Sequence, residues 1–382
     1  MKKVKKRSLL LLLLCIPCLS PAQSQLKSAL NLPRAGDGIF KQQVEYKDPG
    51  RSGENVLWDF SRLNVENDEY ELQYSSLPDS VIVGTEHHTR YYYSLSGDSL
   101  LCHGYENGNT IMTYSRPELQ MKFPVYYKDS TFCFYNGNGK YCDQLNISAM
   151  GTFTTKSDAY GMMILPGGDT LKNVIRMHTR KRIAEETKPL RQPVPLWMQE
   201  EDIENLERVP STDSINYRLA NDTVLLEVET YRWYAAGYRY PVFETVKSIT
   251  KKRGKEREIY NTAFFYPPQA HYYLEDDEEN QKIIETQNHG KKDNPLTEGK
   301  YNVFPNPVST TLEVEIFIPV GAKIKIQVRS VANKSVYINE NKGKFAAGSH
   351  RFQFNVSKLP QGFYIVNIWA DNYLFTETIL KQ

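Results

Sequence analysis

Apolar and polar residues alternate with a period of two through the last 82 residues of this chain, 301–382. In the run LEVEIFI at 312–318 every second residue is apolar, and IKIQV at 324–328 repeats the pattern. Because alternate side chains of a strand share a face, this pattern predicts antiparallel sheets with one buried face each. About seven strands are expected in an immunoglobulin-like β-sandwich, starting near Asn302, Thr311, Ala322, Lys334, His350, Phe363 and Tyr373.

The region before this module, residues 23–273, consists of short alternating segments separated by turn residues. YELQYSSLPDSVIVGTE and RYYYSLSGDSLLCHG are examples, and the chain holds 26 Tyr and 16 Phe. Aromatic and β-branched residues favour strands. We therefore expect an all-β protein whose large central region is β-sandwich-like, either as one unit or as two packed sub-domains. The stretch 195–210 is the exception and is expected to form a short helix or a loop excursion.

The first 22 residues have the pattern of a secretory signal peptide, with five cations in the first seven positions and an apolar run at 9–16. The run is shorter than the ~20 residues that a membrane-spanning helix needs, and cleavage is expected after Ala22. Removing the five cations from the formal net charge of +2 leaves −3 for the mature chain. This balance excludes a typical nucleic-acid binder, and no later segment predicts a transmembrane span.

Residues 274–300 carry both charge signs and little apolar pattern, so composition predicts a charged linker. The terminal module then begins with a stiff segment, because Pro305 and Pro307 fix their own backbone and keep the preceding residues extended. A turn before another strand is predicted at Pro360 and Gly362.

Three short motifs of residues 301–382 together resemble the type A C-terminal sorting domain of type IX secretion, found on exported proteins of the Bacteroidetes. The residues that carry the resemblance are Pro305, Asn306, Pro307, Leu359, Pro360, Gly362, Tyr364 and Lys381. The resemblance implies passage through the periplasm, recognition by an outer-membrane translocon, and a final location at the cell surface or outside the cell. Two departures are Phe304, where Tyr is common, and a short basic ending.

The central region resembles a group of exported proteins from the same bacteria, through GENVLWDFSRL, SDAYGMMILPGGDTLKNVIRMHTR and YRWYAAGYRYPVF. This resemblance brings no activity with it. The chain contains no nucleophile elbow, zinc helix, phosphate-binding glycine loop or calcium loop. We therefore expect no catalytic residue, metal or cofactor, and a secreted binding or structural protein. The alternative is an extracellular enzyme that degrades polysaccharide or peptide from a β scaffold.

Three cysteines follow the leader, and an odd number leaves one thiol unpaired. If FCFYNGNGKYC forms a hairpin centred on Gly137-Asn138, Cys133 and Cys142 face each other and a disulfide is expected, with Cys102 free. Turns centred one residue earlier or later would shift the register and leave the cysteines apart.

Six triplets have Asp followed by Ser or Thr and then an apolar residue or Thr. Such triplets are common where a turn precedes a strand. They also resemble the O-glycosylation acceptor of exported proteins in these bacteria, which implies exposed sites. The acceptors would be Ser80, Ser99, Ser130, Thr170, Ser214 and Thr223.

The run VIRMHTRKR predicts a cationic stripe, because alternate residues of a strand share a face. Its members are Arg176, His178, Arg180 and Arg182. The stripe could bind an acidic glycan or another envelope partner, or it could be a solvated face balanced by acids such as Glu185 and Glu186. Tyrosine clusters at 91–93, 126–127 and 272–273 could likewise offer sugar-stacking platforms or pack in the core.

Overall fold

The computed structural model describes residues 25–166, 170–190, 209–252, 255–272, 274, 276–288, 299–331, 335–371 and 373–382. The predicted signal peptide and nearly all of the expected excursion at 195–210 lie outside these residues. Strands dominate the described chain, which confirms the all-β prediction. None of the helices in the described ranges is long and apolar enough to cross a membrane.

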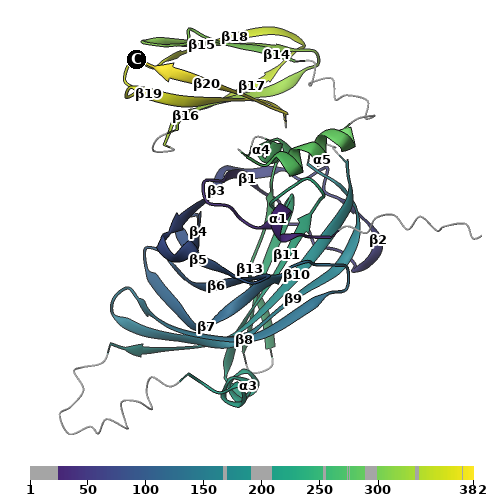
Figure 1. Cartoon of the computed structure of the whole chain (residues 1–382), viewed down its shortest axis with the longest axis vertical. Helices are drawn as coiled ribbons and strands as arrows, with labels where there is room; N and C mark the ends of the chain where they lie inside the picture. The colour runs from purple at the N-terminus through teal and green to yellow at the C-terminus, as the bar shows by residue number, and fades with distance from the viewer. Residues whose placement is uncertain are drawn as a thin grey trace, which may run out of the picture.

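Twelve strands of the central region form one antiparallel sheet that closes on itself (Figure 1). Each strand pairs with the next from β3 to β13, and β1 closes the ring by pairing with both β13 and β3. The strands are β1 (Gly38–Val44), β3 (Val65–Leu77), β4 (Val81–Glu86), β5 (Thr89–Ser96), β6 (Ser99–Glu106), β7 (Thr110–Lys122), β8 (Ser130–Tyr141), β9 (Leu145–Ile164), β10 (Thr170–Pro189), β11 (Val224–Tyr234), β12 (Phe243–Lys252) and β13 (Lys255–Phe265). The central region therefore differs from the expected stack of two sheets.

Alternation along these strands separates an interior from an outer face. On β10, Thr179 and Lys181 line the interior, whereas Arg180 and Arg182 lie on the outer face. The two longest strands, β9 and β10, have 20 residues each. Long twisted strands can coil around a common axis, and closure leaves no exposed sheet edge in the paired parts of the ring. The fold thus offers an enclosed space lined by alternate residues.

Three helices lie at one end of the closed sheet: α1 (Ser28–Asn31), α4 (Pro268–Tyr272) and α5 (Glu278–Asn288) (Figure 1). Arg239 ties this end together, because its guanidinium contacts the Asp277 carboxylate at 2.6 Å and donates to the carbonyls of Leu32 and Ala29 at 3.0 Å. Ile284 of α5 is also buried. Residues 274 and 276–288 are therefore folded onto the central region, where a linker was expected.

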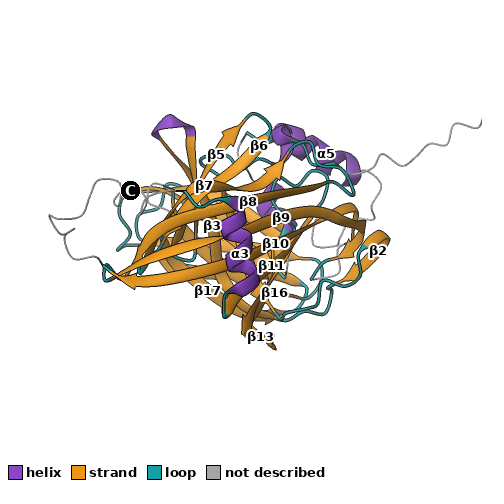
Figure 2. Ribbon diagram, turned by 90° about the horizontal axis from the view of Figure 1, so that it is seen from below, coloured by secondary structure: helices purple, strands orange, loops and turns teal. Residues whose placement is uncertain are grey.

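Two further elements cover the outer face. Strand β2 (Gly53–Asp59) pairs in parallel with the end of β9, and its Trp58 is buried. Helix α3 (Thr212–Asn221) crosses the sheet near β8 to β11 (Figure 2). Ser211 caps α3 by accepting from the backbone N–H of Ser214, and Ile215 and Leu219 are buried. A single-turn helix η1 (Pro78–Ser80) connects β3 to β4.

The terminal module has the seven strands that the sequence predicts, in two sheets of three and four strands. They are β14 (Lys300–Phe304), β15 (Thr311–Ile318), β16 (Ala322–Ser330), β17 (Val336–Phe345), β18 (Gly348–Asn355), β19 (Gly362–Ala370) and β20 (Tyr373–Lys381). One core of mainly Val, Ile and Leu side chains joins both sheets. The apolar residues of the predicted runs at 312–318 and 324–328 belong to this core, apart from the exposed Phe317.

The prediction of a disulfide between Cys133 and Cys142 is wrong. Strand β8 continues without a turn through Gly137 and Asn138, pairing with β7 on one side and β9 on the other. Cys133 therefore lies near the start of β8 and Cys142 just beyond its end, and both thiols are free. The glycines allow close strand approach: a Cβ at Gly137 would lie 2.5 Å from the Thr113 carbonyl oxygen.

The terminal module contacts the central region through β16 and β19. Arg329 Nη1 lies 3.0 Å from Glu71 Oε1, and the Arg329 guanidinium lies 4.9 Å from the centre of the Phe40 ring. Phe40 also meets Trp369 edge to face, with ring centres 6.3 Å apart. A small polar and aromatic contact thus holds the two parts together.

Candidate ligand cavity

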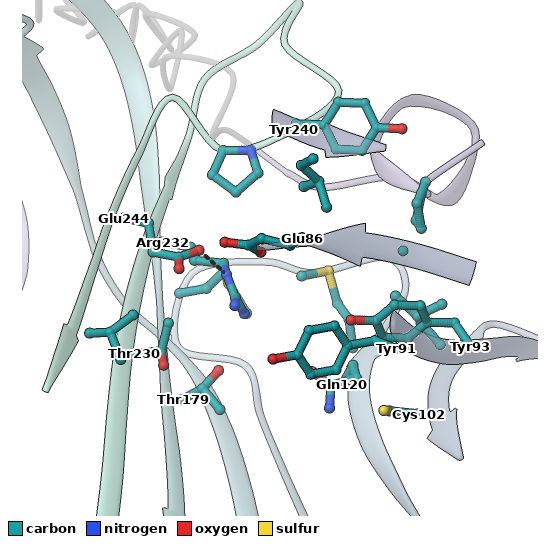
Figure 3. A pocket seen from close by; sticks show the side chains of 18 of the residues that line it. Glu86, Tyr91, Tyr93, Cys102, Gln120, Thr179, Thr230, Arg232, Tyr240 and Glu244 are labelled. Carbon is teal, nitrogen blue, oxygen red and sulfur yellow. Dashed lines mark hydrogen bonds and ion pairs between the residues drawn. The ribbon is translucent and has the colours of Figure 1, made fainter. Parts of the chain in front are cut away.

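A cavity of about 610 Å³ lies inside the closed sheet (Figure 3). Its walls are the inward-facing side chains of β3 to β7 and β9 to β13, and the end is covered by Asn31, Arg239 and Tyr240. This volume falls within the range of ~300–1,000 Å³ typical of small-molecule sites. At about 30 Å³ per water molecule in the liquid, the cavity has the volume of roughly 20 water molecules.

Three ion pairs are built into the cavity wall. Arg232 Nε donates to Glu244 Oε2 at 2.6 Å, and Lys181 Nζ lies 2.5 Å from Glu118 Oε1. Lys41, which is fully buried, contacts Glu86. Buried charges are stable only when they are paired, so the closed sheet has matched each interior charge with its opposite.

Arg232 is the most accessible member of these buried pairs. About 36% of its side-chain surface is accessible, against 8% for Glu244, and the residue lines the cavity beside Glu86 (Figure 3). Burial alone would lower the pKa of Arg232, but the charges of Glu244 and its neighbours raise it well above the ordinary value. The guanidinium is therefore a permanent donor at the cavity surface.

The Glu244 carboxylate is held in its ionised form. Burial opposes the charge, but the cations Arg232 and Lys41 and the hydrogen bonds from Arg232 and Tyr266 together lower the pKa of Glu244. Lys181 is held in the same way, since Glu118 outweighs burial and raises the pKa of Lys181. These groups keep fixed charges at neutral pH.

Tyrosines form the wall opposite Arg232. Tyr91 and Tyr93 project from β5 with ring centres 6.5 Å apart and planes 28° from parallel. Burial raises the pKa of Tyr91 to about 12, so its hydroxyl stays protonated. Gly84 leaves room for these rings, because a Cβ there would lie 3.2 Å from Tyr93 and 3.0 Å from Tyr74.

The ring is least extensively paired between β1 and β13. Strand β1 pairs with β13 only at three residue pairs near the end of β13, from Ala263 to Phe265. The preceding part of β13 pairs with β12 alone among the described strands. Three of the residues that line the cavity are exposed: Tyr260 on this part of β13, His87 in the turn between β4 and β5, and Asn107 in the turn between β6 and β7.

The predicted cationic stripe shares the outer face of β10, but its charges are compensated. Arg176 is 1% exposed, forms two hydrogen bonds of 2.8 Å with Asp158, and packs against Tyr231. Arg180 lies 2.6 Å from Glu227. His178 stacks on Tyr231 and lies 3.6 Å from Glu229, and Arg182 lies 3.9 Å from Glu227. The compensating acids come from β9 and β11, which the local sequence did not indicate.

The other predicted sites have mixed positions. Ser80, Ser130, Ser214 and Thr223 are exposed, whereas Ser99 and Thr170 are half-buried. His87 and His88 form the β4–β5 turn, both with positive φ. No group of three or more potential metal ligands occurs in the part of the chain that the structure describes.

Sequence reasoning missed the cavity-lining charges Glu86, Glu118, Lys181, Arg232 and Glu244. Neighbours of these residues are also polar or aromatic, as in TYRWY at 230–234. Alternation alone therefore could not show which face of β11 turns inward. The partners of Lys181 and Glu86 lie far away in the sequence, and Glu244, on the next strand, pairs with Arg232 only in the particular β11–β12 register.

The three sorting motifs meet at the end of β20. The Asn306 side chain donates to the Thr378 carbonyl and accepts from the Leu380 N–H, both at 2.9 Å. On the other side of β20, Gly362 pairs with Lys381, and the Tyr364 hydroxyl donates to the Pro360 carbonyl at 2.8 Å. Lys381 is buried and contacts the Gln382 carbonyl oxygen. Motifs far apart in the sequence thus form one continuous feature.

Comparison with known proteins supports only the terminal part. A search of curated protein sequences found no match. The chain is similar to a solved structure of dimeric latent PorU from Porphyromonas gingivalis at 10% identity and a TM-score of 0.19, over 90% of this chain and 34% of that one. The chain thus spans about a third of that protein, and a likeness this low carries no argument.

The family model described as "Secretion system C-terminal sorting domain" matches residues 302–382. This confirms the resemblance stated from the three motifs and implies interaction with the type IX secretion machinery. Residues 302–382 are a type IX secretion C-terminal sorting domain, and the chain is a protein exported to the cell surface or the extracellular space.

Proposed function

We propose that this chain is an exported binding protein without enzymatic activity, which holds a small ligand inside its closed sheet. Residues 1–22 would direct entry into the periplasm, and residues 301–382 would then engage the outer-membrane translocon of the type IX system. The central region, after export, would be the functional part.

The cavity of about 610 Å³ is the observation that carries this proposal. An interior that served only stability would be close-packed with apolar side chains. Here three ion pairs and several hydroxyl groups surround open space instead. Maintaining charges around a cavity costs stability, and ligand binding gives a reason for that cost.

The enzyme alternative has less support. General acid catalysis on a glycosidic bond needs a carboxyl group that is protonated near neutral pH, beside a second carboxylate. The cavity-lining acids Glu86, Glu118 and Glu244 are each paired with a cation. For Glu244 these contacts also lower the pKa. This arrangement favours retention of a ligand over proton transfer.

The proposal is tested by extracting small molecules from the exported protein. The full chain is expressed in a strain with type IX secretion, isolated from the surface or medium, denatured, and analysed by mass spectrometry. A Thr179→Trp variant places an indole in the cavity, and Lys156→Trp, on the exposed outer face of β9, is the matched control. We expect a molecule released from wild type and the control, and much less from Thr179→Trp. Equal recovery from all three, or none from any, contradicts the proposal.

We also propose O-glycosylation at the exposed acceptors Ser80, Ser130, Ser214 and Thr223, with less at the half-buried Ser99 and Thr170. Exposure supports this, because a modifying enzyme must reach the hydroxyl. An intact mass equal to that of the bare mature chain would contradict it.

A further inference from the structure

We propose that the cavity ligand is a neutral saccharide of one or two rings. This inference rests on the proposed function, namely that the cavity holds a ligand. The arrangement of its two walls, the balance of its charges and its size each restrict the class of molecule that fits.

The cavity has two chemically different walls on opposite sides. Tyr91 and Tyr93 lie on β5, whereas Thr230 and Arg232 lie on β11. These strands are six positions apart in a ring of twelve, which places them across the cavity from each other. In Figure 3 the two tyrosine rings lie on one side, and Arg232, Thr230 and Thr179 on the other.

The tyrosine wall suits a sugar ring. Aromatic faces pack against apolar surfaces, and the two rings lie only 28° from parallel. A pyranose offers C–H groups on its face and hydroxyls around its edge. Stacking on Tyr91 and Tyr93 would therefore direct the edge hydroxyls along the tyrosine wall, toward the polar side chains at its sides, and turn the second ring face toward the polar wall.

The polar wall offers donors and acceptors together. Arg232 uses Nε for Glu244 and lines the cavity with the rest of its guanidinium. Thr230 and Thr179 can donate or accept. Glu86 on β4 and Gln120 on β7 add polar groups at the sides of the tyrosine wall. A sugar hydroxyl is also both donor and acceptor, so it can satisfy mixed groups that a carboxylate or an alkyl chain would leave unpaired.

Charge balance argues against an ionic ligand. Glu86, Glu118, Lys181, Arg232, Arg239 and Glu244 line the cavity, and each forms an ion pair. An incoming anion would find no uncompensated cation among them, and would lose its hydration without a matching charge. A lipid is disfavoured for a different reason, because its apolar chain would cover paired charges and hydroxyl groups. A neutral polyol avoids both penalties.

The test measures binding of four neutral disaccharides to the full chain by isothermal titration calorimetry: cellobiose, maltose, lactose and N,N′-diacetylchitobiose. Benzoate and oleate represent the anionic and lipid classes. Tyr91→Ala removes one stacking ring, and Tyr92→Ala is the matched control, because Tyr92 is the neighbour on β5 that does not line the cavity. Thr230→Val is a second variant, in case Tyr91→Ala fails to fold. It removes one hydroxyl from the polar wall and keeps the shape of the side chain nearly unchanged.

We expect at least one neutral disaccharide to bind, with affinity about tenfold weaker in Tyr91→Ala, equivalent to about 1.4 kcal/mol. Thr230→Val is expected to weaken binding severalfold, and Tyr92→Ala less than twofold. Saccharide binding that is equal in all variants overturns the inference, because the site would lie elsewhere.

Binding of benzoate or oleate alone, dependent on Tyr91, would overturn the saccharide class and leave the proposed function standing. A panel without any binding, combined with a molecule extracted from wild type and lost from Thr179→Trp, would have the same meaning. If the panel and the extraction were both negative, the inference and the proposed function would fall together.

Discussion

Replacing Arg176 with Ala tests whether the cationic stripe is structural or free to bind a partner. Arg176 is 1% exposed and is enclosed by β9, β10 and β11 and the segment before β2. Its guanidinium makes two hydrogen bonds of 2.8 Å with Asp158 and one of 2.5 Å with the Pro49 carbonyl. The Arg176→Ala variant would leave the Asp158 carboxylate, 9% exposed, without this partner.

The expected loss is large. Removing one member of a buried ion pair costs about 3–5 kcal/mol, because the remaining charge stays buried. Arg180 is the matched comparison: its side chain is 46% exposed, and its partner Glu227 also contacts Lys251 at 3.4 Å. Glu227 is itself only 4% exposed, but Lys251 and Arg182 would still compensate it, so Arg180→Ala should cost less than Arg176→Ala. Since a domain is typically stable by about 5–15 kcal/mol, the two variants should differ clearly.

Urea unfolding of the full chain, followed by tryptophan fluorescence, measures both losses. The Arg176 guanidinium lies 5.7 Å from the Trp58 ring and 5.8 Å from the Trp233 ring, so the signal reports on this region. If Arg176→Ala were no less stable than Arg180→Ala, the structural assignment would be refuted. Reduced binding of an anionic polysaccharide in a folded Arg176→Ala variant would instead restore the binding hypothesis.

Three further predictions concern thiols, pH and export. Cys142, which is exposed, should react rapidly with iodoacetamide. Cys102 should react slowly, because burial raises its pKa to about 12. A disulfide-linked peptide in a non-reducing peptide map would contradict the prediction of free thiols. Burial lowers the pKa of His271 from its ordinary 6.5 to about 3. As the pH falls, His271 therefore becomes protonated in the unfolded chain before it does so in the folded chain. The stability from neutral His271 is therefore complete above about pH 6.5 and falls as the pH drops toward 3. When the pH is lowered from about 7.5 to 5.5, His271 should reduce the free energy of unfolding of the wild type by about 1.4 kcal/mol. This contribution should be absent from His271→Phe, and urea unfolding of both proteins at the two pH values measures the difference. Deleting residues 301–382 should trap the protein in the periplasm by cell fractionation, and Asn306→Ala, which loses both hydrogen bonds to the end of the chain, should reduce surface delivery. Unimpaired delivery of either variant would count against the sorting role.

Local pattern was sufficient for the sorting domain. The seven observed strands begin within two residues of the predicted starts. Strands β15, β16 and β19 there bury alternate residues in the core between the two sheets, so alternation in their sequence corresponds directly to burial. Three short motifs also identified the family, because each depends on a particular residue in a turn or at the chain end.

The hairpin at 133–142 shows where local pattern failed. Asn-Gly pairs are typical of tight turns, yet Gly137 and Gly139 lie within β8. At both positions a Cβ would come within 2.5 Å of a carbonyl oxygen of β7. The glycines there serve close packing between strands, which is a tertiary requirement that a single sequence does not distinguish from a turn.

The sequence by itself determined the all-β class, the seven strands of the terminal domain and the export route, since each depends on residues close together in the chain. Only the tertiary structure decided that twelve strands close into a ring, because closure depends on β1 pairing with both β3 and β13. It also decided which faces turn inward. Arg232 meets Glu244 on the neighbouring strand β12, Lys41 meets Glu86 across β3, and Lys181 meets Glu118 across β8 and β9. These pairs surround open space only because the ring closes, so the cavity could not be predicted from local order.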